Sequence, residues 1–251
     1  MQALEILRNF RKQEKKGLAV LLDPDKEGGR GLPDRIRKLA EAGPDFFFVG
    51  GSLITGNNFH ILIEAIRKTC EIPVLIFPGS GMHIHADADG ILLLSLISGR
   101  NAELLIGQHV VAAPVLKQSG LEILPTGYLL VDGGKPTTVS YMSNTVPIPA
   151  DKPEIALCTA MAGEMLGLQL LYLDAGSGAL QPVSPEMIAL VRNGTSLPLL
   201  AGGGIRSADE AKAAWQAGAD CLVVGNALES RPGLIAELCA SRNEFFQSPA
   251  H

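Results

Sequence analysis

Eight short apolar runs alternate with segments of helical periodicity, and this alternation is the feature that most constrains the fold. The runs cover residues 18–22, 46–49, 74–77, 90–94, 123–131, 170–173, 197–201 and 221–224. Helical patterns lie between most of them, at residues 32–42, 58–70, 101–116, 155–166, 185–192 and 208–217. Such alternation is typical of parallel strands joined by crossover helices. Eight strand–helix pairs can close into a barrel.

Length and composition fit a single (β/α)8 TIM barrel domain over residues 1–251. The chain has 251 residues, close to the roughly 250 that are typical of this α/β fold. Its residues are 47% apolar but only 5% aromatic, which suits buried parallel strands of Val, Ile and Leu.

Two stretches depart from this pattern. The third run is followed almost directly by the fourth, so we expect a loop in place of the helix there. Residues 121–152 fit one bent strand plus a loop as well as they fit two strands.

Charge and hydropathy exclude several classes of protein. The net charge of −5 argues against a general nucleic-acid role. The sequence has neither an apolar run long enough to span a membrane nor the apolar core of a signal peptide, so we expect a cytoplasmic protein. The mean hydropathy of +0.23 fits either an apolar groove or a buried subunit interface, and we expect a homo-oligomer.

The four cysteines lack the spacing of a metal site. Cys158 and Cys221 lie in apolar stretches, which predicts buried free thiols.

Glycine-rich turns follow the last two apolar runs. They read Gly202-Gly203-Gly204-Ile205-Arg206 and Val223-Val224-Gly225-Asn226-Ala227. Glycines let the backbone approach an anion, and free N–H groups at a helix start then point towards it. After strands 7 and 8 of a barrel, such turns commonly build a phosphate site. The alternative is that they are only tight turns between strand and helix.

Polar residues follow other predicted strands. The first strand is followed by Asp23-Pro24-Asp25-Lys26, in which Pro24 keeps Asp23 extended. A carboxylate beside a phosphate site suggests Mg²⁺, which binds one or two carboxylates together with phosphate oxygens. An Asp that caps a polar loop is the alternative.

Two further turns, Gly50-Gly51-Ser52 and Pro78-Gly79-Ser80, also allow backbone to approach an anion. The barrel mouth therefore has two anion-binding regions, which implies two substrates or one substrate with two phosphates. The sixth strand and the turn after it supply Tyr172-Leu173-Asp174-Ala175-Gly176-Ser177-Gly178. Asp174 either accepts a proton from a substrate hydroxyl as a general base or only positions that hydroxyl.

Taken together and in this order, these motifs resemble the geranylgeranylglyceryl phosphate synthase family, which is related to the heptaprenylglyceryl phosphate synthases. The resemblance covers about residues 17–230. It implies an Mg²⁺-dependent transfer of a prenyl group from a prenyl diphosphate to the 3-hydroxyl of sn-glycerol 1-phosphate, with release of pyrophosphate. The product is an ether lipid precursor, so transient contact with a membrane surface is expected on its release.

The resemblance also assigns residues to roles. It makes Asp23 and Ser52 the Mg²⁺ ligands and Asp174 the catalytic residue. The glycerol 1-phosphate site would consist of Tyr172, Leu173, Asp174, Ala175, Gly176, Ser177, Gly178, Gly203, Gly204, Gly225 and Asn226. The apolar candidates for a prenyl groove are Phe77, Met82, Tyr128 and Tyr141.

Two positions bear on the branch of the family. Asp174 stands where members usually have Glu, so its carboxylate stem is one methylene shorter. Leu21 stands where the bacillar branch has Lys, which favours the other branch and a C20 donor over a C35 donor.

Two other functions share part of this pattern. Sugar-phosphate isomerases and lyases of amino-acid biosynthesis share the strand 7 and 8 turns, but the isomerases have a second Asp after strand 5, where this chain has Pro125-Thr126-Gly127-Tyr128. A non-catalytic flavin- or phosphate-binding barrel would have no use for Asp23 and Asp174.

Overall fold

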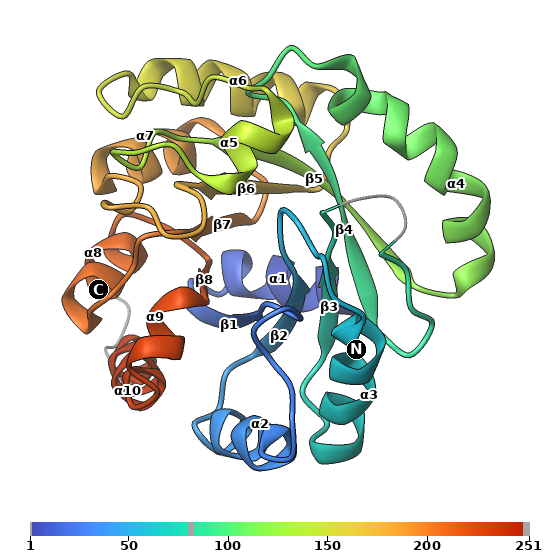
Figure 1. Cartoon of the computed structure of the whole chain (residues 1–251). Helices are drawn as coiled ribbons and strands as arrows, with labels where there is room; N and C mark the ends of the chain where they lie inside the picture. Colours follow the sequence, from blue (N-terminus) through green and yellow to red (C-terminus); the bar gives the residue numbers. More distant parts are fainter. Residues whose placement is uncertain (1, 80–82, 248–251) are drawn as a thin grey trace.

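A computed structural model describes residues 2–79 and 83–247. Eight parallel strands form a closed barrel in chain order, with each strand paired to the next and β8 paired to β1 (Figure 1). The strands are β1 (Gly17–Leu22), β2 (Phe46–Gly50), β3 (Val74–Phe77), β4 (Gly90–Leu96), β5 (Glu122–Leu130), β6 (Leu170–Asp174), β7 (Leu199–Gly202) and β8 (Cys221–Val224). The predicted barrel is confirmed, and each predicted run overlaps one strand.

Helices cover the outside of the barrel and its amino-terminal end (Figure 1). They are α1 (Ala3–Lys12), α2 (Leu32–Glu41), α3 (Asn58–Thr69), the π-helical turn η1 (Glu103–Gly107), α4 (Gln108–Ser119), α5 (Thr138–Ser143), α6 (Pro153–Met165), α7 (Pro185–Gly194), α8 (Ala208–Gln216), α9 (Asn226–Ser230) and α10 (Leu234–Gln247). As predicted, the described residues between β3 and β4 form no helix. Residues 121–152 form one strand, β5, followed by a loop that contains α5 and returns to the barrel at the bridge between Val131 and Ile148.

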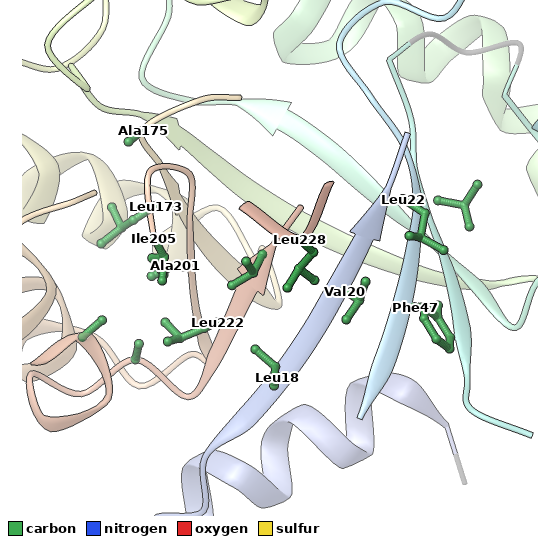
Figure 2. Packing of buried hydrophobic residues seen from close by; sticks show 14 of the residues in the cluster. Leu18, Val20, Leu22, Phe47, Leu173, Ala175, Ala201, Ile205, Leu222 and Leu228 are labelled. Atoms are coloured by element: carbon green, nitrogen blue, oxygen red, sulfur yellow. The ribbon is translucent and has the colours of Figure 1, made fainter. Parts of the chain in front are cut away.

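Alternation of side chains along each strand produces two apolar cores. On β1, Leu18, Val20 and Leu22 face outwards and pack under the helices, as Figure 2 shows. Ala19, between them, joins the inner core, together with Phe46 and Phe48 of β2. A side chain on one of these strands therefore supports either the helix layer or the barrel interior.

Helix α1 closes the amino-terminal end of the barrel. Its Leu7 and Phe10 are buried in the inner core. The Glu122 carboxylate at the start of β5 accepts hydrogen bonds from the backbone N–H groups of Ala3 and Leu4, at 2.6 and 3.0 Å. A carboxylate at a helix N-terminus also opposes the helix dipole favourably. The carboxyl ends of the strands, at the other end of the barrel, are left for a site.

The prediction of buried cysteines was wrong for Cys158. Cys221 is buried on a strand, but Cys158 is exposed on α6. The apolar stretch that contains Cys158 continues onto the outer face of the helix, so apolar neighbours in sequence did not mean burial. In the part of the chain that the structure describes, no helix is long and apolar enough to cross a membrane.

Candidate active site

A polar pocket of about 220 Å³ lies at the carboxyl ends of the strands. Residues from the loops after β1, β2, β6, β7 and β8 line it. They include Asp23, Lys26, Ser52, Tyr172, Asp174, Ser177, Gly178, Gly203, Gly204, Gly225, Asn226 and Glu229. Segments that are far apart in sequence thus meet at one place, where the parallel strands end together.

The loop after β1 has two carboxylates with different surroundings. Asp25 accepts hydrogen bonds from the backbone N–H and hydroxyl of Thr55 and from the N–H of Gly56, at 2.7 to 2.8 Å. These bonds hold the pKa of Asp25 below its usual value and tie the β1 loop to the β2 loop. Asp23 lines the pocket instead, with Oδ2 3.6 Å from the ammonium of Lys26. Lys26 also pairs with Glu229 at 3.0 Å.

The loops after β2 and β3 pack closely on each other. A Cβ on Gly79 would lie 2.1 Å from the carbonyl oxygen of Gly51, so the two backbones touch. A Cβ on Gly51 would lie 3.9 Å from Cγ of Asp23, which brings the β2 loop beside that carboxylate. Ser52 follows in the same loop and lines the pocket. Ser80, in the predicted anion-binding turn, lies outside the described residues.

Asp174, at the end of β6, is a buried carboxylate that two donors hold in place. The hydroxyl of Tyr128 donates a hydrogen bond to Oδ2, and the backbone N–H of Gly176 donates one to Oδ1 at 2.8 Å. Burial raises the pKa of Asp174 above its usual value, and these two bonds partly oppose the rise. The carboxylate therefore binds a proton more readily than an exposed Asp, as a general base near neutral pH requires.

The glycine loops after β7 and β8 form the opposite wall. Gly203 and Gly204 both have φ of +76°, in the left-handed region that favours glycine. A Cβ on Gly203 would lie 2.7 Å from Oδ1 of Asp174. The Asn226 carboxamide oxygen accepts a hydrogen bond from the Ser177 hydroxyl at 2.9 Å, which joins the β6 and β8 loops.

A second cavity of about 330 Å³ adjoins the polar pocket and is mainly apolar. Ser52 and Phe77 line both spaces, so the two meet there. The cavity runs between the barrel mouth, η1 and α4, and its lining includes Ile84, Ile91, Leu93, Leu94, Leu96, Leu104, Ala112, Leu116, Tyr128, Val139 and Met142. A polar pocket of a size and chemistry that could hold phosphates thus continues into an apolar cavity that could hold a hydrocarbon chain.

Comparison with known proteins assigns this site to a family. The model of the PcrB family matches residues 10–241. The chain belongs to the PcrB family. Geranylgeranylglyceryl phosphate synthases of Spirosoma linguale and Chitinophaga pinensis are 55% and 50% identical to it. The alignments cover 98% of this chain and 98% of the Spirosoma protein, and 93% and 94% for the Chitinophaga protein.

Solved structures agree with this assignment. The (S)-3-O-geranylgeranylglyceryl phosphate synthase of Thermoplasma acidophilum, crystallised with its substrate sn-glycerol 1-phosphate, superposes with a TM-score of 0.91 and 32% identity, covering 97% of this chain and 99% of that one. A tryptophan synthase alpha chain from Legionella pneumophila has a TM-score of 0.58 and 17% identity over 99% of this chain and 100% of its own. At that identity the likeness concerns the barrel fold alone.

In this PcrB family member, most of the predicted site residues come together in the polar pocket, but three lie differently. The side chains of Leu173 and Ala175 point outwards into the core under the helices (Figure 2). The Ala175 N–H bonds to the carbonyl of Gly202, and the Gly176 N–H bonds to Asp174. Of this segment, Tyr172, Asp174, Ser177 and Gly178 line the pocket.

The start of α8 offers fewer free N–H groups than expected. The Ser207 hydroxyl accepts a hydrogen bond from the Glu210 N–H at 3.2 Å. The Glu210 carboxylate in turn accepts from the N–H groups of Arg206 and Ser207, at 2.6 and 3.1 Å. This capping box satisfies the N–H groups of Arg206, Ser207 and Glu210. The residues of this segment that line the pocket, Gly203 to Arg206, come before the helix. The signal was present in the sequence as Ser207 with Glu210 three residues later.

Tyr128 is the residue whose role was missed, because it was considered only as groove lining. It lies near the end of β5 with its ring in the inner core, in edge-on contact with Phe77 and Tyr172 at 6.2 and 5.5 Å between ring centroids. The register between β5 and β6 decides which carboxylate the Tyr128 hydroxyl reaches. Tyr128 is aligned with Tyr172, two residues before Asp174 on the neighbouring strand. Of the other groove candidates, Phe77 lines the cavity, Tyr141 is 85% exposed, and Met82 lies outside the described residues.

Replacing Gly203 by alanine should damage this site. A residue with a Cβ in left-handed conformation costs roughly 1–2 kcal/mol, and this Cβ would also press on Asp174. We expect a lower melting temperature and loss of sn-glycerol 1-phosphate binding by calorimetry. Gly29 also has a positive φ but open space around its Cβ position, so Gly29→Ala should lower stability and leave binding intact.

Proposed function

We propose that this chain is a prenyltransferase that joins a prenyl diphosphate, by preference geranylgeranyl diphosphate, to the 3-hydroxyl of sn-glycerol 1-phosphate and releases pyrophosphate. The observation that carries the proposal is the junction at Ser52 and Phe77 of a polar, glycine-walled pocket with an apolar cavity. A phosphorylated alcohol and an isoprenoid chain would meet at that point. Relatives of 50% and 55% identity that are named geranylgeranylglyceryl phosphate synthases support it.

In the proposed reaction, the 3-hydroxyl oxygen bonds to C1 of the prenyl chain while the bond from C1 to the diphosphate oxygen breaks. The hydroxyl proton passes to Asp174 and the diphosphate leaves with the bonding electrons. Tyr128 and the Gly176 N–H orient the carboxylate before the substrate binds. The glycine loops after β7 and β8 would hold the glycerol phosphate beside it.

We propose Asp23 and Ser52 as the groups that would hold Mg²⁺. Both line the polar pocket, and one carboxylate and one hydroxyl match an ion that takes its other ligands from diphosphate and water. In residues 2–79 and 83–247, no cluster of three His, Cys, Asp or Glu side chains could hold a metal by itself. The ion would therefore bind together with the diphosphate. When bound, it would stabilise the negative charge that develops on the leaving group.

The apolar cavity is the proposed prenyl site. Each buried CH₂ group adds about 0.8 kcal/mol of binding free energy, so a long isoprenoid would bind there strongly. We place the reaction in the cytoplasm, with brief contact between the enzyme and a membrane when the product leaves.

The role of Asp174 predicts a pH effect in a variant of its partner. The pKa of Asp174 is raised by burial and lowered by the Tyr128 hydrogen bond, so Tyr128→Phe should raise it further. A base acts when ionised, so activity should rise with pH through this pKa, and the acid limb of the kcat profile should move to higher pH in the variant. A limb that stays in place while kcat falls uniformly would contradict this assignment.

The size of the apolar cavity should limit the length of the prenyl donor that binds. Ala112 of α4 is 7% exposed and lines the apolar cavity. Ala112→Phe would fill part of it, so we expect kcat/KM to fall more for a C20 than for a C15 donor. The matched control is Ala113→Phe, which points to solvent on the same helix and should leave the ratio unchanged. Equal losses of kcat/KM for both donors in Ala112→Phe would mean that the prenyl group binds outside this cavity.

The function itself is tested by a transfer assay with radiolabelled sn-glycerol 1-phosphate and C15, C20 and C35 prenyl diphosphates in the presence of Mg²⁺. We expect a lipid-soluble product, best with C20 and absent with sn-glycerol 3-phosphate. Phosphate binding without product from any donor would instead favour the isomerase or binding-protein functions. Against the isomerase alternative, the acid that follows β5 is Asp132, which is exposed, accepts a hydrogen bond from the Gly134 N–H and does not line the polar pocket.

A further inference from the structure

The lining of the polar pocket has little positive charge to offer a phosphate group. A phosphomonoester has roughly two negative charges near neutral pH. The charged residues that line the pocket are three acids and two bases, Asp23, Asp174, Glu229, Lys26 and Arg206. Lys26 already lies between Asp23 and Glu229, at 3.6 and 3.0 Å. Among these lining residues, Arg206 is the one cation whose side chain pairs with no carboxylate in the part of the chain that the structure describes.

A second cation lies just outside this lining, on the loop after β5. A Cβ on Gly178 would lie 3.8 Å from Nζ of Lys135 and 4.0 Å from Nδ2 of Asn226. Apart from residues 177–179 themselves, no other heavy atom of the described chain lies within 4 Å of that point. Two nitrogen donors and no acceptor therefore border the backbone at Gly178, which itself lines the pocket.

The protein does not use these donors itself. The Asn226 carboxamide accepts the Ser177 hydroxyl through Oδ1 at 2.9 Å, which leaves Nδ2 on the side of Gly178. No described residue accepts a hydrogen bond from Asn226 Nδ2, from Lys135 Nζ or from the backbone N–H groups of Ser177 and Gly178. Lys135 makes no ion pair with a described residue either. Converging donors without acceptors are what an anion site requires.

The backbone that bears Lys135 is restrained. The Asp132 carboxylate accepts a hydrogen bond from the Gly134 N–H at 2.9 Å, and Gly134 has a φ of +86°, in the region that favours glycine. Pro136 comes next after Lys135 and disfavours a helical conformation there. The direction in which the lysine leaves the loop is therefore set by its neighbours in sequence.

The loop after β6 lies between the two cations, since β6 lies between β5 and β7 in the barrel. On the β5 side, the Gly133 carbonyl accepts a hydrogen bond from the Leu180 N–H at 2.8 Å. On the β7 side, the Arg206 guanidinium donates to the carbonyls of Ala179 and Leu180. Lys135 and Arg206 therefore approach the same loop from its two neighbours.

We propose that Lys135 binds the phosphate group of sn-glycerol 1-phosphate, an inference that rests on the proposed function. Its ammonium would donate to a phosphate oxygen beside Gly178, together with Asn226 Nδ2 and the free N–H groups of the β6 loop. Arg206 would add its charge from the β7 side while its hydrogen bonds hold that loop. The diphosphate would bind at the loops after β1 and β2, so Lys135 would act on the acceptor substrate and not on the donor.

The test is the affinity of the full chain and its variants for sn-glycerol 1-phosphate, inorganic phosphate and inorganic pyrophosphate with Mg²⁺, measured by titration calorimetry. Lys135→Met keeps an unbranched side chain without the charge, and should weaken binding of the first two roughly tenfold. Pyrophosphate affinity and the melting temperature should not change, and Lys135→Arg should restore most of the loss. The matched control is Lys117→Met, the same charge loss at an exposed position in the last turn of α4, which should alter no affinity.

Salt gives a readout that a merely structural role would not move. Charges at an exposed site are screened by salt, so the affinity of the unaltered chain for sn-glycerol 1-phosphate should fall between about 0.05 and 0.5 M salt. The fall should be clearly smaller in Lys135→Met, because the screened charge is absent. The same slope in both proteins would contradict a direct contact between Lys135 and the phosphate.

The outcomes separate this proposal from the proposed function. Unchanged affinity of Lys135→Met for sn-glycerol 1-phosphate, with prenyl transfer by the unaltered protein intact, would overturn the role of Lys135 and leave the reaction standing. A loss confined to pyrophosphate would assign the lysine to the donor and overturn the proposal as well. Phosphate binding that depends on Lys135 in a protein that transfers no prenyl group would support the anion site and count against the reaction. An unaltered chain that binds none of the three anions would overturn both.

Discussion

Replacing Asp174 by asparagine should lower kcat for transfer to sn-glycerol 1-phosphate by roughly 10²–10⁴-fold, the usual contribution of a general base. Asparagine has nearly the same shape, but it cannot accept the hydroxyl proton. Its carbonyl oxygen can still accept the Gly176 N–H, and its amide can donate to the oxygen of Tyr128 in place of the present bond. The loop should therefore keep its conformation, and single-turnover measurements would report the chemistry alone.

The melting temperature of the variant distinguishes loss of the base from loss of the folded structure. Burial disfavours the ionised form of Asp174, as its raised pKa indicates. A neutral side chain removes that penalty, so the melting temperature of Asp174→Asn at neutral pH should not fall. Asp174→Glu restores a carboxylate and should recover activity relative to Asn. An Asn variant with kcat close to that of the unaltered protein would limit Asp174 to positioning the hydroxyl.

The barrel could be predicted because its signal is local and repeated. Each apolar run marks a strand by composition, and the alternation of eight such runs with helices predicts the closed order of the strands but not the register between neighbours. The loop in place of a helix after β3 was also predictable, since the sequence between β3 and β4 is too short for a helix. The exposure of Cys158 could not be predicted, because apolar residues on the outer face of α6 resemble core residues in the sequence.

The site residues could be predicted where their motifs lie at the ends of predicted strands. Asp23, Ser52, Asp174 and the glycine turns converge because strand ends converge. The partner of Asp174 was not evident, since the bond from Tyr128 spans 46 residues and depends on the alignment of β5 with β6. Which N–H groups are free also depends on tertiary contacts.

A substitution at Asp23 should impair the proposed Mg²⁺ site and leave the proposed glycerol phosphate site intact. Metal stabilisation of a leaving group is worth several kcal/mol, and each 1.36 kcal/mol is tenfold in rate. Asp23→Asn should therefore lower Mg²⁺-dependent turnover by roughly 10²–10³-fold. The glycerol phosphate loops after β6, β7 and β8 keep their own contacts, so calorimetric binding of sn-glycerol 1-phosphate should persist.

The control for Asp23 is the second carboxylate of the same loop. Asp25→Asn makes the same change of charge two residues away, at a side chain whose partners are Thr55 and Gly56 and which does not line the pocket. It should loosen the β1 and β2 loops yet preserve the Mg²⁺ concentration at half-maximal rate, whereas Asp23→Asn should raise that concentration or abolish the dependence. If Asp23→Asn weakens glycerol phosphate binding as strongly as turnover, Asp23 acts on the whole pocket through its contact with Lys26, and the assignment to the metal fails.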